Sequence, residues 1–99
     1  MTVETAQIET TLYKDPNEKL DYQFDWNTDY LRGADTISSS TWTSTPTGLT
    51  HVATSNTTTT ATIRISSGLV GTTYTVTNHV VLASGQEAER SFYLKVVDR

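Results

Sequence analysis

Residues 20–26 read Leu-Asp-Tyr-Gln-Phe-Asp-Trp, and this stretch decides the fold class. Large apolar side chains at Leu20, Tyr22, Phe24 and Trp26 alternate with polar ones. Successive side chains of a β-strand point to opposite faces, so a period of two places all four apolar groups on one side. The stretch therefore predicts a β-strand with one buried face and one face toward water.

The same alternation recurs along the rest of the chain. A strand over 36–43 would bury both Ile37 and Trp42 only if a bulge near Ser38–Ser40 corrects their opposite parity. A strand over 49–55 is expected to bury Leu49 and Val52. Turn signals separate these strands, and the chain has no amphipathic helix pattern. The pattern predicts an all-β fold, an immunoglobulin-like β-sandwich of about seven antiparallel strands, over residues 12–14, 20–26, 36–43, 49–55, 60–66, 73–82 and 87–97.

The length of 99 residues allows one core. We expect the sandwich domain to span 11–99 and residues 1–10 to form an N-terminal arm, with a frayed terminus as the alternative. An extended arm can add a strand to the open sheet edge of a neighbour. Val3 and Ile8 would then be the side chains that contact this partner.

The segment Gly71-Thr72-Thr73-Tyr74-Thr75-Val76 places a tyrosine near the start of a predicted strand. This arrangement is similar to the tyrosine corner of immunoglobulin-like folds, in which the hydroxyl bonds to upstream backbone. Val76 would then take the place of the second cysteine of an antibody domain, and Trp42 that of the third-strand tryptophan. An ordinary tyrosine at the core edge is the alternative to a tyrosine corner. An SH3-like or other small barrel is the alternative to the sandwich.

Charge and cysteine content restrict the possible partners. The net charge is −4 and the few basic residues are scattered, which argues against nucleic acid. No stretch approaches the roughly 20 apolar residues of a membrane span, and the N-terminus does not have the pattern of a signal peptide. The chain has no cysteine, which excludes disulfides and thiolate chemistry.

We identify no catalytic, cofactor-binding or metal-binding residue from the sequence. His51 and His79 lack a metal-ligand spacing and are interpreted as surface strand residues. Asp21 and Asp25 are expected on the exposed face of their strand. A calcium site around Asp29 and Asp35 is conceivable, although the EF-hand spacing is absent.

Aromatic residues leave a carbohydrate-binding role open. Trp26, Trp42 and Tyr30 could form a platform for sugar, or they could belong to the core. Exposure of the two tryptophans separates these alternatives.

Several segments, in this order and spacing, resemble a group of small tailed-phage virion proteins, and the likeness covers almost the whole chain beyond the arm. They are Lys14-Asp15-Pro16, Leu20-Asp21-Tyr22, Phe24-Asp25-Trp26, Gly33–Ile37, Gly48–Thr50, Gly71–Val76 and Arg90–Val97.

The resemblance implies a non-enzymatic, immunoglobulin-like structural protein of the virion. Its implied role is an adaptor joining tail or neck and fibre, present in multiple symmetric copies. A capsid decoration protein and a carbohydrate-binding module are the alternatives. The resemblance implies other virion proteins as partners, without nucleic acid, membrane or cofactor, and synthesis in the host cytoplasm.

Overall fold

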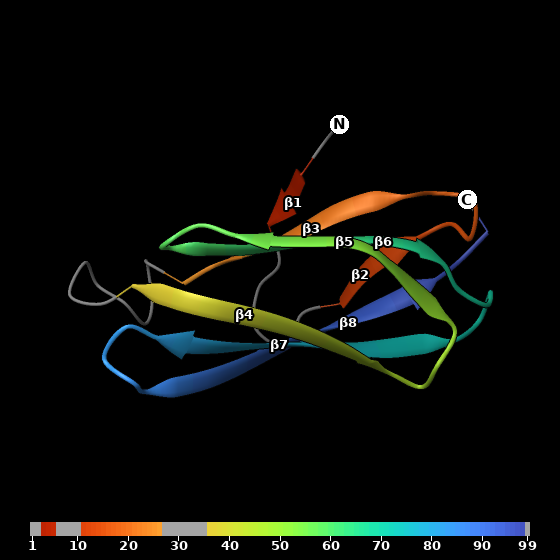
Figure 1. Cartoon of the computed structure of the whole chain (residues 1–99). Coiled ribbons are helices and arrows are strands. Elements are labelled where there is room, and N and C mark those ends of the chain that lie inside the picture. Colours follow the sequence, from red (N-terminus) through yellow and green to blue (C-terminus); the bar gives the residue numbers. More distant parts are fainter. Residues whose placement is uncertain (1–2, 6–10, 27–35, 99) are drawn as a thin grey trace.

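The computed structural model describes residues 3–5, 11–26 and 36–98, and every regular element in these ranges is a strand (Figure 1). The strands are β1 (Val3–Thr5), β2 (Thr11–Lys14), β3 (Leu20–Asp25), β4 (Ile37–Thr45), β5 (Leu49–Asn56), β6 (Thr60–Ser67), β7 (Thr73–Leu82) and β8 (Glu87–Val96). In the described part of the chain, no helix is long and apolar enough to cross a membrane.

The strands form two four-stranded sheets that lie face to face (Figure 1). Their orders are β1-β3-β6-β5 and β2-β8-β7-β4. The strands β3 to β8 pair with one another in antiparallel orientation. The two N-terminal strands pair in parallel, β1 with β3 and β2 with β8. The all-β prediction is confirmed, and β2 to β8 correspond to the seven predicted strands. The prediction that all seven are antiparallel is wrong for β2, which pairs in parallel with β8. The additional strand β1 lies within the residues expected to form the arm.

The alternating stretch that begins at Leu20 forms β3, an inner strand between β1 and β6. Tyr22, Phe24 and Trp26 are completely or almost completely buried. Across the sheet, Tyr22 pairs with Ile63 and Phe24 with Ala61. The predicted inward face is therefore correct, and it is continued by the inward face of β6.

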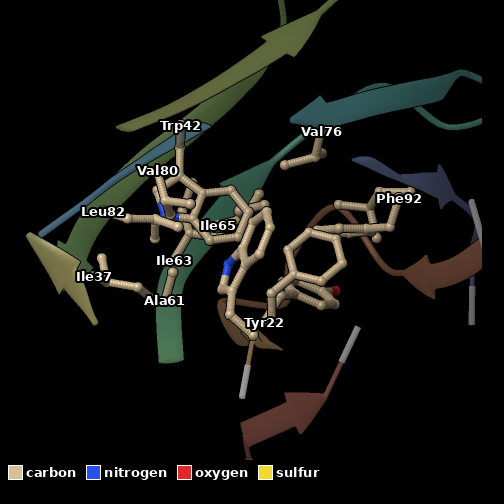
Figure 2. Close-up of a cluster of buried hydrophobic side chains, with 13 residues drawn as sticks. Tyr22, Ile37, Trp42, Ala61, Ile63, Ile65, Val76, Val80, Leu82 and Phe92 are labelled. Carbon is tan, nitrogen blue, oxygen red and sulfur yellow. The ribbon is translucent and has the colours of Figure 1, made fainter. Parts of the chain in front are cut away.

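An aromatic cluster joins the two sheets at the centre of the core (Figure 2). The Phe24 ring of β3 stacks on Trp42 of β4, with the ring centres 6.0 Å apart. Phe92 of β8 lies 5.8 Å from Phe24 and 5.4 Å from Tyr22. Such pairs contribute roughly 0.5–1.5 kcal/mol each beyond their burial. The sheets are thus held together by large side chains in a chain without disulfides.

Two β-bulges decide which side chains of β4 and β5 face inward. The register of β4 against β7 shifts between Ile37 and Ser39, and both Ile37 and Trp42 are buried as predicted. The burial predicted for Val52 is wrong, because this side chain is 42% exposed. Leu49 and Val52 have opposite parity, so burying both would require a bulge between them. The register of β5 against β6 instead shifts between His51 and Ala53, with Val52 itself as the extra residue of the bulge.

Asn78 is a completely buried polar side chain in this core. Its Oδ1 accepts a hydrogen bond from Nε1 of Trp26 at 2.9 Å. Its Nδ2 donates to Oγ of Ser40 at 2.8 Å and to the carbonyl of Thr41 at 3.0 Å. The amide therefore connects β7 with β4 of its own sheet and with the end of β3 in the other sheet.

Arg90 interrupts the apolar inward positions of β8. Its guanidinium lies 4.5 Å from the centre of the Trp26 ring, in the geometry of a cation–π contact. The charged group therefore covers the rim of the core at the tryptophan that Asn78 also binds.

Replacing Asn78 tests the interior amide. Asn78→Ala removes the acceptor of Trp26 and the donor to β4, and it opens a cavity, so the free energy of unfolding should fall by roughly 2–4 kcal/mol. Urea denaturation followed by tryptophan fluorescence measures the change. Thr73→Ala, at an exposed position of the same strand, is the control and should change stability by less than about 0.5 kcal/mol. Equal stability of the two variants would contradict the assigned role of Asn78.

Candidate interaction surfaces

The two residues predicted to contact a partner lie at the N-terminus. Val3 belongs to β1, whose backbone pairs in parallel with β3, with Val3 opposite Asp21. Ile8 lies outside the described residues. The contact of these two side chains with a neighbour stays a prediction.

Asp21 forms an ion pair on the outer face of its sheet. Its carboxylate accepts hydrogen bonds from Nε and Nη2 of Arg64 at 2.7 and 3.2 Å. This contact raises the pKa of Arg64, first through the hydrogen bond and then through the charge of Asp21. Asp21 lies on the outer face as predicted, but its side chain is buried beside this guanidinium rather than exposed. The other carboxylates considered for calcium, Asp29 and Asp35, lie outside the described residues.

Lys14 is completely buried where β2 ends. Its Nζ donates to the carbonyls of Asp15 at 2.8 Å and of Ser67 at 2.6 Å. Burial lowers the pKa of this amine, against the opposing effect of the carboxylates of Glu18 and Asp15. Because Ser67 ends β6 in the other sheet, the ammonium group joins the two layers at this end of the domain.

His79 lies between two carboxylates on the outer face of β7. Its Nε2 is 2.7 Å from Glu87 and its Nδ1 is 3.0 Å from Glu89, both on β8. Hydrogen bonds to Glu87 and then Glu89 raise the pKa of His79 above 6.5. The protonated ring, which donates at both nitrogens, therefore connects the two strands of this hairpin. The prediction of a surface strand residue is consistent with its partly exposed side chain.

The aromatic side chains considered as a sugar platform are buried where they can be placed. Trp26 is 0% and Trp42 8% exposed. A buried indole face offers no surface on which a sugar can stack. Tyr30 lies outside the described residues. Within the described ranges, no group of three or more His, Cys, Asp or Glu side chains is arranged to hold a metal ion.

The long edge strands present exposed polar side chains. The edge strands are β1 and β5 in one sheet and β2 and β4 in the other. Every residue of β5 from Thr50 to Asn56 is exposed. A pocket of about 130 Å³ lies beside β5, lined by Ala53, Ser55, Thr62, Arg64 and Asp21. Sequence alternation did not identify these edges, because edge position depends on the order of strands in the sheet.

In the described ranges, two facing layers of β-strands with open edges define a small all-β domain. The chain belongs to the family described as podophage GP4 fibre-tail adaptor protein gp77, whose sequence model matches residues 14–95. It is therefore a structural protein of a bacteriophage virion, as the resemblance predicted. No curated protein matches the chain in a sequence comparison.

The matched region coincides with the sandwich. It contains β3 to β7 in full and β8 up to its penultimate residue, and it begins at the buried Lys14. Val3 and Ile8 lie before it. The elements that build the core are thus those that the family shares.

The His79 cluster predicts a pH dependence of stability. Because the pKa of folded His79 lies above its ordinary value of 6.5, its contribution is fully present below pH 6.5 and is lost as pH rises through the higher folded pKa. The melting temperature should therefore fall between pH 6 and pH 8. His79→Gln should lack this component in thermal scans followed by circular dichroism.

His51→Gln is the matched control, because it removes the other imidazole and leaves the contacts of His79 with Glu87 and Glu89 in place. A pH profile of His79→Gln that is parallel to the wild-type profile would contradict the assignment.

Proposed function

We propose that this chain is a non-enzymatic, immunoglobulin-like adaptor that joins the tail or neck of a phage virion to a fibre. The observation that carries the proposal is the family match over residues 14–95. In this proposal, the chain is made in the host cytoplasm and is present in several symmetric copies in the particle. Its partners are the neighbouring virion proteins, with no role for nucleic acid or membrane.

The strand order supports the immunoglobulin-like assignment. With β3, β4, β5, β6, β7 and β8 read as strands B, C, D, E, F and G, one sheet contains B, E and D and the other contains G, F and C. These are the two sheets of an immunoglobulin constant-type domain. The N-terminal strands β1 and β2 then take the positions of a first strand divided between the two sheets.

The contacts of Tyr74 support the same assignment. Its hydroxyl accepts a hydrogen bond from the backbone N–H of Leu69 at 3.0 Å, five residues upstream. A Cβ on Gly48, whose φ is +137°, would lie 2.7 Å from this hydroxyl. Val76, two residues after the tyrosine, is completely buried, and Trp42 is buried on β4. These positions are those of the second cysteine and the third-strand tryptophan in antibody domains.

The use of ionisable groups supports a structural rather than a catalytic role. The ammonium of Lys14 is bound by backbone carbonyls, and Arg64 is paired with Asp21. His79 is held between two glutamates of the neighbouring strand. Each group thus has a partner that holds together strands of the domain itself.

A carbohydrate-binding module is the weaker candidate, because Trp26 and Trp42 belong to the core. Capsid decoration differs from the adaptor role only in the place of the protein in the particle. We propose that the N-terminal arm determines which virion protein the domain binds, because the arm precedes the region shared with the family. Val3 and Ile8 would fill apolar pockets of that neighbour.

Replacing the corner tyrosine tests the fold assignment. Tyr74→Phe keeps the ring and removes the hydroxyl that binds Leu69, so we expect a loss of about 1 kcal/mol in the free energy of unfolding. Urea denaturation measures it. Tyr13→Phe, at a side chain that is 49% exposed, should leave stability unchanged. A Tyr74→Phe variant as stable as the Tyr13→Phe control would remove the tyrosine-corner argument.

Particles made without this protein test the adaptor role. A phage that carries a stop codon in this gene, grown in a host without a suppressor, should yield tailed particles that lack fibres in electron micrographs. Supplying the full chain from a plasmid should restore the fibres. Supplying the Val3→Asp, Ile8→Asp double variant should not, because charged groups cannot enter apolar pockets without a large desolvation cost.

Mass spectrometry of the purified particles verifies that the protein is absent. Fibres in place on such particles would contradict the adaptor role. Intact fibres together with capsids that rupture more easily would assign the protein to capsid decoration instead.

A further inference from the structure

The charged residues of the chain are unevenly distributed. Between Asp35 and Arg64 the sequence contains no Asp, Glu, Lys or Arg, and the next charged residue after Arg64 is Glu87. Serine and threonine make up much of the region. The strands formed from it are β4, β5, β6 and β7, and Arg64 on β6 is the only Asp, Glu, Lys or Arg among them.

In the folded domain this uncharged region becomes one side of the sandwich. β5 and β4 are the edge strands of the two sheets, and they contact each other (Figure 1). The opposite side carries β1 and β2 at its edges and β3 and β8 next to them. The Asp, Glu, Lys and Arg residues of the strands, Arg64 excepted, belong to these four strands, and His79 of β7 is paired with Glu87 and Glu89 of β8. The sandwich therefore has one uncharged and one charged side.

Exposed strand edges of soluble proteins are usually protected by charge, proline or short length. β1 and β2 are 3 and 4 residues long, whereas β4 and β5 are 9 and 8. Neither long edge strand contains a proline or a charged residue. Each of the two strands is instead interrupted by one bulge, at Ser38 in β4 and at Val52 in β5. Residues Ala53–Asn56 follow the second bulge in regular register with β6.

β5 also contributes little to its own core. All its side chains beyond Leu49 are exposed, whereas β4 buries Ile37 and Trp42. Its pairing with β6 occupies one side of its backbone, and in the described ranges no strand pairs with the other side. The free N–H and C=O groups of that side can accept a further strand.

We infer that β5 is a self-association edge, onto which β5 of a second copy of this chain adds in antiparallel orientation through Ala53–Asn56. Each copy carries a net charge of −4, so two copies repel each other wherever their charged sides meet. Contact through β5 brings only uncharged residues together at the join. The isologous pair unites two four-stranded sheets into one continuous sheet about a two-fold axis.

Cysteine scanning tests this pairing, since the chain contains no cysteine of its own. In an antiparallel pair of identical strands, a residue near the two-fold axis lies opposite its own copy at about 4.5–5.5 Å between Cβ atoms, close to the distance that a disulfide requires. Single variants Ala53→Cys, Thr54→Cys, Ser55→Cys and Asn56→Cys are oxidised with copper phenanthroline at high protein concentration. Non-reducing electrophoresis then measures the rate of dimer formation.

We expect the rate of disulfide-linked dimer formation to be highest at one or two of these positions. There it should exceed the rate of Thr11→Cys by at least tenfold. Thr11 is the matched control because it is exposed on the opposite edge strand β2. Equal rates at all five positions would overturn the inference. So would dimers that disappear when residues 1–10 are deleted, because the arm would then be the segment that holds the second copy.

Sedimentation equilibrium of the cysteine-free protein provides a second test. The wild type should show concentration-dependent dimer formation up to millimolar concentration, and Thr54→Lys should reduce the association constant at least tenfold, whereas Thr11→Lys should not. A wild type that remains monomeric would overturn the inference. These measurements use the purified protein alone, so their failure is distinguishable from failure of the adaptor role, which is read from fibres on particles.

Discussion

The packing of the β3 aromatic side chains against the opposite sheet is the interaction on which the rest of the structure depends. Phe24 contacts Trp42 and Phe92, which come from two different strands of the other layer. In antibody domains a disulfide with a tryptophan packed on it connects the two sheets, but this chain has no cysteine. Large buried rings can take over the role, since each contributes area and preferred geometry together. This contact between the layers therefore fixes the positions of the edge strands and of the outer faces of both sheets.

Buried polar groups add alignment to that packing. Asn78 binds the end of β3 and the middle of β4 at once, and Lys14 binds the carbonyl that ends β6. A displacement of one sheet along the other would leave these groups without partners in a dry interior, which costs more than the lost contacts themselves. The aromatic rings therefore hold the layers together, and the amide and the ammonium fix how the layers are aligned.

The sequence allowed prediction of the strands and their inward faces because alternation is a local property. It also located the bulge of β4, since the opposite parity of Ile37 and Trp42 required one. It failed for Val52 because this residue has the opposite parity from Leu49, so regular alternation from Leu49 turns it outward, and the bulge of β5 lies at Val52 itself. It placed Asp21 on the outer face but did not predict its burial, because the covering Arg64 lies 43 residues away. The open edges follow from strand order, although the uncharged run after Asp35 could have indicated one of them.

The division of the sandwich into two unlike sides is consistent with a protein that must meet both its own copies and other proteins. Copies with the same negative charge approach most easily through an uncharged side, where hydroxyl and backbone groups supply the contact and no ion pair has to be matched. Contacts with an unlike partner gain specificity from charges placed to match that partner. The charged side carries β1, so the proposed arm contact and the proposed β5 contact can form in the same particle without competing for one edge.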